Sequence, residues 1–205
     1  NGDWDLDATW ESGSVPASTD DVIIAHNNDV DDTRSCNTLT ISAGGRLDVQ
    51  AALTVATSSS VGSGAVLNIK SGGTYTQTAG SFTNSGGTIT VFAGQDMVFS
   101  SNSTTVTNTG VIEINSSSSL FGSLILKGSY SESGVGVINY RRYVAGTSTW
   151  DLIGPPLSGY DMEDFIDENT DIATGNGSGA GASGEYAVGY YTNTAAAYNA
   201  GNAWV

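Results

Sequence analysis

The chain has 205 residues, with 21 Asp and Glu against six Lys and Arg, and its net charge is −15. This acidic balance excludes the basic surface that nucleic-acid binding requires. The single Cys36 excludes an intrachain disulfide and a cysteine metal cluster, and no apolar run approaches the ~20 residues that a membrane helix needs.

The charge divides the chain into three parts. Residues 1–36 carry nine acids and one base, residues 37–134 carry four acids and three bases, and residues 135–205 carry eight acids and two bases. We therefore predict an N-terminal cap over 1–37, a nearly uncharged body over 38–140 and a distinct C-terminal segment over 141–205. Because the chain starts without Met and shows no signal peptide, we expect a protein that has already been processed during export.

The first residues suggest a metal site. Asp3, Asp5 and Asp7 stand at alternate positions, which is the spacing that begins an EF-hand calcium loop. The match ends there, because Ala8 replaces the turn glycine and Ser14 replaces the bidentate glutamate. The spacing predicts calcium as a cofactor at the three aspartates. The alternative is that these acids are only the solvent-exposed, charged surface of the cap.

The remaining features of 1–37 predict structure rather than catalysis. Trp4 and Trp10 are suited to covering the open first coil of a repeat protein, whose ends must be shielded. Residues 20–24 read as a buried strand after a turn at Pro16. His26 is the only histidine and has no serine or cysteine motif beside it, so we assign it a structural role.

The body repeats one short phrase of five residues: a Gly or other small residue, a variable residue, an aliphatic residue, a polar residue and another apolar residue. The first aliphatic of each phrase falls at residues 47, 67, 89, 112 and 138, so the steps are 20, 22, 23 and 26 residues. A period of this size is typical of a solenoid, in which stacking of the coils makes the core. The alternation predicts that Leu47, Leu67, Ile89 and Ile112 stack as one buried ladder.

We therefore predict an all-β fold, a β-helix of two or three short strands per coil. A β-sandwich also has short strands at regular spacing, but it has no reason to repeat one phrase at this interval. Handedness and the number of strands per coil stay open.

The N-terminal half carries a resemblance. Gly2-Asp3-Trp4, Thr9-Trp10, Val15-Pro16 and residues 20–24, followed by residues 39–41 and 44–49, resemble a module of secreted bacterial β-solenoid surface proteins, many of them adhesin-like and exported by the type IX secretion system. The resemblance covers residues 2–140. It implies an extracellular or cell-surface location and supplies no catalytic residues.

The repeat stops after Tyr140. Arg141-Arg142-Tyr143 and Trp150-Asp151-Leu152-Ile153-Gly154 resemble the start of a compact β-rich module in the same class of proteins. Residues 160–167 suit a short helix and residues 185–191 a strand. We expect this segment to be incomplete and the chain to be the N-terminal part of a longer protein.

Two functions compete on these observations. The first is a non-enzymatic structural or adhesive protein, a stalk or binding module that could assemble into a fibre, with surface glycans or copies of itself as partners. The second is a β-helix protein that binds or degrades polysaccharide. Asp48 and Glu113 share the outward position of the repeat, but Asn68 and Thr90 lie between them. A separation of about 14 Å at strand spacing is too large for a glycosidase pair.

Other possibilities rest on side chains of the body. Tyr75, Tyr130 and Tyr140 are candidates for stacking on sugars. Ice binding would need ranks of threonine, but the outward positions of the repeat phrase do not form one. The series at 74–78 and 105–109 supply threonines in only two coils. We therefore predict no enzyme activity and no catalytic residue.

Overall fold

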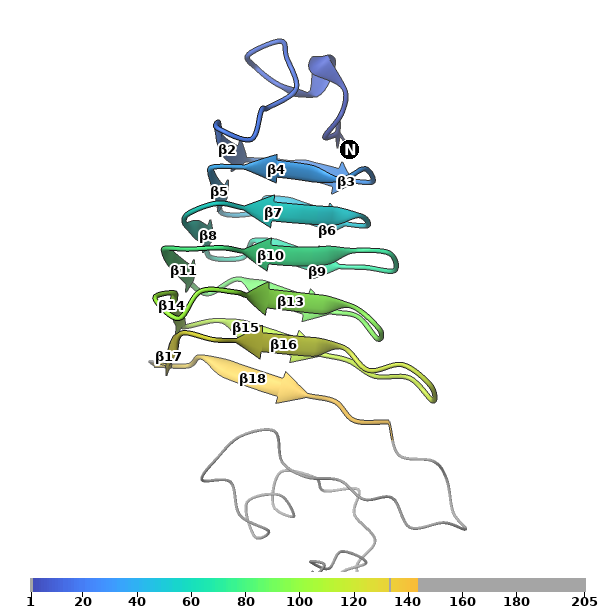
Figure 1. The fold of residues 1–205 in the computed structure, drawn as a ribbon, viewed down its shortest axis with the longest axis vertical. Helices are drawn as coiled ribbons and strands as arrows, with labels where there is room; N and C mark the ends of the chain where they lie inside the picture. Colours follow the sequence, from blue (N-terminus) through green and yellow to red (C-terminus); the bar gives the residue numbers. More distant parts are fainter. Residues whose placement is uncertain (1, 133, 144–205) are drawn as a thin grey trace, which may run out of the picture. The chain divides into compact units, whose positions relative to one another are not determined.

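The computed structural model describes residues 2–132 and 134–143, which form a β-solenoid of six coils. Each complete coil contributes one strand to each of three parallel sheets, which we call sheets A, B and C (Figure 1). The expected segments at 160–167 and 185–191 lie outside the described residues.

The strands of sheet A follow the repeat phrase. They are β1 (Gly2–Asp3), β3 (Asn27–Val30), β6 (Arg46–Val49), β9 (Val66–Ile69), β12 (Thr88–Val91), β15 (Val111–Ile114) and β18 (Val137–Tyr140). Sheet B contains β2 (Asp21–Ile24), β5 (Thr38–Ile41), β8 (Ser59–Val61), β11 (Ser81–Asn84), β14 (Thr105–Asn108) and β17 (Ser129–Glu132). Sheet C contains β4 (Arg34–Cys36), β7 (Ala52–Val55), β10 (Thr74–Gln77), β13 (Asp96–Phe99) and β16 (Ser123–Leu126).

The predicted aliphatic ladder is confirmed. Leu47, Leu67, Ile89 and Ile112 are paired in register on neighbouring strands of sheet A, and none is more than 1% exposed. Each coil can bury its apolar side chains only against the coils above and below, because a single coil has no core of its own. The sequence period therefore translates directly into the stacked core.

Glycines make the corners between sheets B and A. Gly44 has φ 75°, a conformation that glycine adopts without steric cost, and Gly64 and Gly86 repeat it at the same corner of the next coils. A Cβ on the following Gly45 would lie 2.5 Å from the carbonyl oxygen of Ile24 in the coil before. The corner therefore needs glycine twice, once for the positive φ and once for the close approach to the coil before.

Large side chains fill the middle coils. The rings of Tyr75, Phe82 and Phe99 meet edge to face, with centroids 5.1–6.3 Å apart. The hydroxyl of Tyr75 lies 2.6 Å from Ser59 Oγ and donates to Gln77 Oε1 at 3.2 Å, which satisfies its polar end inside the core. Tyr75 is fully buried, so its assignment as a sugar-stacking residue is wrong.

Residues 4–20 close the first coil, as expected for a cap. Trp4 is fully buried, and the ring of Trp10 meets it edge to face at 5.1 Å while donating from Nε1 to the Trp4 carbonyl at 2.8 Å. The short helix η1 (Asp7–Thr9) lies in this segment (Figure 1). The coils begin at Asp21, so three solenoid strands lie within the range 1–37 that the sequence assigned to the cap.

The sixth coil is less buried than the others. Leu124, Leu126, Tyr130 and Ile138 pack against the core but are only partly buried, whereas the matching side chains of earlier coils are inaccessible. No further coil follows within residues 2–132 and 134–143, so among these residues a coil packs against the side chains from one side only.

We predict that Ile89→Ala lowers the free energy of unfolding by about 2–5 kcal/mol, because it leaves a cavity between two filled rungs. The matched control is Thr88→Ala, one residue earlier on the same strand and exposed, for which the change should stay within about 0.5 kcal/mol. Urea denaturation of both variants measures the difference. Equal midpoints for the two would contradict a stacked aliphatic core.

Candidate functional site

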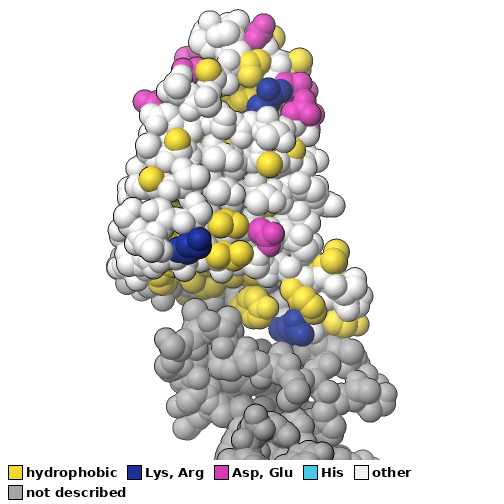
Figure 2. Space-filling model, viewed as in Figure 1, with side chains coloured by type: hydrophobic (Ala, Val, Ile, Leu, Met, Phe, Trp, Pro, Cys, Tyr) yellow, Lys and Arg dark blue, Asp and Glu magenta, His cyan; other side chains and the backbone are white. Residues whose placement is uncertain are grey.

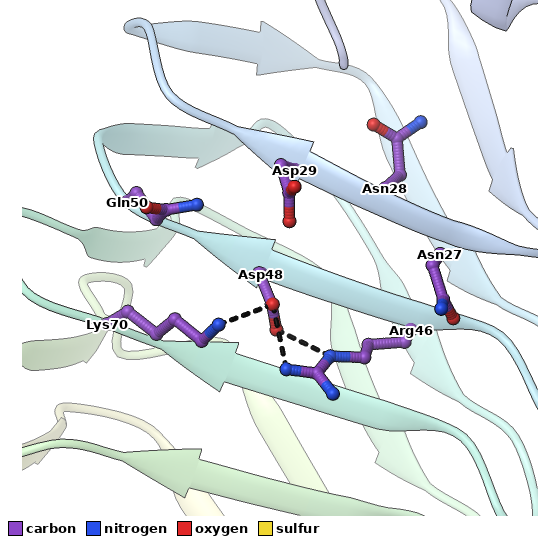
Figure 3. A pocket seen from close by; sticks show the side chains of 7 residues that line it. All are labelled: Asn27, Asn28, Asp29, Arg46, Asp48, Gln50 and Lys70. Carbon is purple, nitrogen blue, oxygen red and sulfur yellow. Dashed lines mark hydrogen bonds and ion pairs between the residues drawn. The ribbon is translucent and has the colours of Figure 1, made fainter. Parts of the chain in front are cut away.

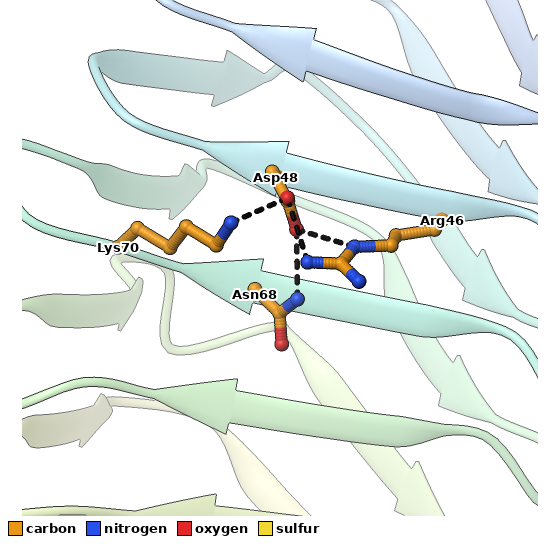
Figure 4. Close-up of polar contacts among 4 residues, drawn as sticks. All are labelled: Arg46, Asp48, Asn68 and Lys70. Atoms are coloured by element: carbon orange, nitrogen blue, oxygen red, sulfur yellow. Dashed lines mark hydrogen bonds and ion pairs between the residues drawn. The ribbon is translucent and has the colours of Figure 1, made fainter. Parts of the chain in front are cut away.

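A charged cluster lies on the outer face of sheet A, around Asp48 (Figures 3 and 4). It borders a shallow hollow of about 260 Å³ that Asn27, Asp29 and Gln50 also line. Asp48 Oδ1 accepts hydrogen bonds from Arg46 Nε at 2.9 Å and Asn68 Nδ2 at 2.7 Å. Its Oδ2 accepts from an Arg46 guanidinium nitrogen at 2.9 Å and from Lys70 Nζ at 2.5 Å.

These contacts determine the ionisation of Asp48. Burial of the side chain, which is 7% exposed, raises its pKa, but the hydrogen bonds from Arg46, Lys70 and Asn68 outweigh burial, and the net pKa lies below the ordinary value. The bond to Asp48 in turn raises the pKa of Arg46. A carboxylate with both oxygens occupied by three donor residues is a poor general base, since it is neither free nor basic.

The second carboxylate of the outward row is also engaged. Glu113 Oε1 accepts from Arg141 at 2.9 Å. The register places Asp48, Asn68, Thr90 and Glu113 at the same position of four successive strands. The two acids are therefore separated by two strands that carry an uncharged residue there, as the sequence predicted. The geometry of a two-carboxylate glycosidase is therefore not formed by this pair.

A second candidate surface is the outer face of sheet B. We call it the hydroxyl face, and it consists of two rows of Ser and Thr that run along five successive coils. The central row contains Thr40, Ser60, Thr83, Thr107 and Ser131, which pair in register. The second row contains Thr38, Ser81, Thr105 and Ser129, with Ser58 in the place just before β8.

The hydroxyl face is regular and uncharged. Its members are partly or fully exposed, and no Asp, Glu, Lys or Arg stands in either row between Thr38 and Ser131. Parallel pairing repeats the hydroxyls at ~4.8 Å from coil to coil and ~6.6 Å along each strand. The face therefore offers a lattice of donors and acceptors at fixed spacings.

Sequence reasoning missed this surface. It tested for ranked threonines at the outward positions of sheet A and found none, which the register confirms. It then grouped residues 74–78 with 105–109, but Thr74 and Thr76 lie on sheet C, whereas Thr105 and Thr107 lie on sheet B. The sequence signal that could have found it is a pair of Ser or Thr residues separated by one residue, which recurs at the start of each of the second to sixth coils.

The predicted calcium ligands do not form a cluster. Asp5 lies 3.8 Å from Arg34, and Asp7 Oδ1 accepts the backbone N–H of Val15 at 2.9 Å. Among the described residues, no group of three or more His, Cys, Asp or Glu side chains is arranged to hold a metal ion, and this includes Asp3 with its neighbours. Calcium binding at Asp3, Asp5 and Asp7 stays a prediction without support from the geometry.

The structure also places the single cysteine and the two remaining tyrosines that were candidates for sugar stacking. Cys36 is fully buried in the core, where burial raises the pKa of its thiol to about 12 and so disfavours the thiolate that a nucleophile requires. Tyr130 packs against the core and its hydroxyl accepts from Asn108 at 3.3 Å. Tyr140 is 37% exposed and stays available for stacking.

The charge of the described residues is concentrated at one end of the solenoid (Figure 2). In the view of Figure 2 the acids gather mainly toward the N-terminal end, and most of the surface between the ends is uncharged. Among the residues described, no helix is long and apolar enough to span a membrane.

In comparisons with known proteins, the chain matches no protein-family model, no curated protein and no solved structure. The fold and its surfaces are therefore the basis for the functional argument.

We predict that Asp48→Asn destabilises the protein by about 1–3 kcal/mol at pH 7, because Arg46 and Lys70 lose their counter-charge but stay partly solvated. The folded pKa of Asp48 is lowered, so its contribution is fully present above about pH 4, the unfolded pKa, and is lost as the pH falls further. Asp31→Asn, at an exposed acid, is the control. The difference in thermal midpoint between the two variants should shrink below pH 4, and a pH-independent difference would contradict this assignment.

Proposed function

We propose that the chain is a non-enzymatic structural and adhesive module that works outside the cell and binds through its hydroxyl face. The observation that carries this proposal is the pair of in-register Ser/Thr rows over five coils. Glycans, which recognise surfaces through many hydroxyl hydrogen bonds, are the proposed ligands, and neighbouring copies of the chain are the other partners.

The site chemistry supports a binding role over a catalytic one. Asp48 and Glu113 are held by basic partners and stand on strands separated by two uncharged rungs. Asp96 accepts a hydrogen bond from Ser123 on the neighbouring strand, so it too has a structural partner. The resemblance to surface proteins exported by the type IX system is the reason for proposing a cell-surface or extracellular location and, with the stacked coils, a stalk-like or fibre-forming role.

Two alternatives remain as proposals. One is a polysaccharide-binding or polysaccharide-degrading β-helix protein, which would use the same surface or the hollow at Asp48. The other is ice binding, which the register of the hydroxyl face now favours more than the sequence did. Ranked hydroxyls at ~4.8 Å spacing offer ordered water a matching set of donors and acceptors.

The test compares two double variants with matched positions. Thr83→Lys with Thr107→Lys places two charges on the hydroxyl face, and Thr54→Lys with Thr76→Lys places them on paired outward threonines of sheet C. We expect the first pair to weaken retention on an immobilised polysaccharide at least about tenfold and the second pair to change it little. Circular dichroism and thermal unfolding verify that both fold.

The same proteins are screened for released reducing ends and for incorporation into growing ice. Binding without cleavage, lost only in the sheet B variant, supports the adhesive module. Released reducing ends would replace it with the enzymatic alternative, and ice uptake lost in the sheet B variant would replace it with ice binding. Equal loss of glycan retention in both variants would contradict the assignment to sheet B.

A further inference from the structure

The N-terminal end of sheet B borders an open groove. The groove has a volume of about 1230 Å³ and lies between the cap and the first coil. All of β2 lines it, together with Trp10 and Pro16 from the cap and His26 from the corner after β2. Figure 1 shows the cap segment as a loop that extends beyond the first coil before the chain enters β2.

The strand β2 has an unpaired edge in this groove. It is the last strand of sheet B, with β5 on one side and no described strand on the other. The carbonyls of Asp20 and Ile24 accept from Asn37 and Ser42 on the β5 side. Alternate residues of a parallel strand direct both backbone groups to the same side, so Asp21 and Ile23 direct theirs into the groove.

The three sheets are closed differently at this end. β1 pairs with β3 and completes sheet A, and Arg34 of β4 lies within 4 Å of Asp5 in the cap and of Asp32 in the loop before β4. Among the described residues no strand pairs with the outer edge of β2, and Ile23 on its outer face is 66% exposed. An open, β-branched edge strand is a template for adding another strand unless it is blocked by Pro, Lys or a bulge, and β2 contains none of these.

The chemistry of the groove favours a cationic occupant. Glu11, Asp20 and Asp21 line it, and no lining residue is Lys or Arg. The groove thus offers negative charge beside the outer-edge backbone groups of Asp21 and Ile23, which no described strand uses.

We propose that this groove binds an extended, Lys- or Arg-bearing peptide segment of a partner protein, which adds to β2 as a seventh strand of sheet B. Main-chain hydrogen bonds to Asp21 and Ile23 provide the affinity, and the acids of the groove select basic side chains. The inference does not depend on glycan binding by the hydroxyl face, because it uses the strand edge rather than the outer face.

The decisive variant is Ile23→Pro. Proline removes the backbone N–H that faces the groove but leaves the hydrogen bonds to β5, and proline is tolerated on edge strands for this reason. Ile23→Thr is the matched control, because it removes the same exposed side chain and keeps the N–H. Both are compared with the unmodified chain by circular dichroism and thermal unfolding.

The probes are fluorescent synthetic peptides in which valine alternates with lysine or, as the charge control, with glutamate. Fluorescence anisotropy should give at least about tenfold tighter binding of the lysine peptide, weakened by salt. Ile23→Pro should reduce this binding at least about tenfold, and Ile23→Thr should largely retain it. Equal binding by the Pro and Thr variants would show a non-specific attraction to an acidic protein and overturn the proposal.

Hydrogen exchange on the unmodified chain provides a second readout that needs no variant to fold. Saturating lysine peptide should slow exchange of the amides of Asp21 and Ile23. Unchanged exchange at β2 would overturn the proposal. Concentration-dependent dimerisation that Ile23→Pro abolishes, without peptide binding, would assign the edge to a second copy of the chain instead and equally overturn it.

Discussion

The structure depends on in-register parallel pairing between one coil and the next. Each buried side chain contacts its equivalent one coil away, as in the Leu47, Leu67, Ile89 and Ile112 ladder. Because a coil contributes only a few apolar residues, stability comes from these repeated contacts rather than from a compact centre. The same pairing that stacks the core also stacks whatever faces outward, so any recurring surface residue becomes a row.

Buried polar side chains continue the stack at core positions where the apolar pattern is interrupted. The ladder of Ile24, Ile41 and Val61 continues as Asn84 and Asn108. Asn84 binds the backbone N–H and carbonyl of Gly87, and its Nδ2 donates to Asn108 Oδ1 at 2.8 Å. These amides therefore satisfy backbone groups at a corner that would otherwise be buried without partners. Outside the core, Asp48 plays the same part by joining β6 to β9 through Asn68.

The two candidate surfaces differ in whether their polar side chains already have hydrogen-bond partners within the protein. At Asp48 both carboxylate oxygens accept hydrogen bonds from Arg46, Asn68 or Lys70, which favours a role in holding strands together. On the hydroxyl face, the one bond between the central-row hydroxyls of Ser60 and Thr40 is long, at 3.3 Å, and the side chains remain accessible. Thr38 and Ser58 of the second row have partners in Asp21 and in the backbone of Ser81. The accessible hydroxyls of the central row are better suited to contact with an external partner. The backbone N–H and carbonyl groups at the outer edge of β2 are suited to an external partner for the same reason, because no described strand pairs with them.

The period of the repeat phrase by itself determined that the chain is a solenoid, which residues form its aliphatic ladder and that Asp48 and Glu113 are too far apart to act together. It did not determine that each coil has three strands, that coils begin at Asp21, or that Tyr75 is inside. Those depend on how the corners fold, since a one-residue change in a corner moves every following side chain to the other face. The hydroxyl face was hidden for the same reason: Thr76 and Thr107 look equivalent in the sequence, and only the corners decide that they lie on different sheets.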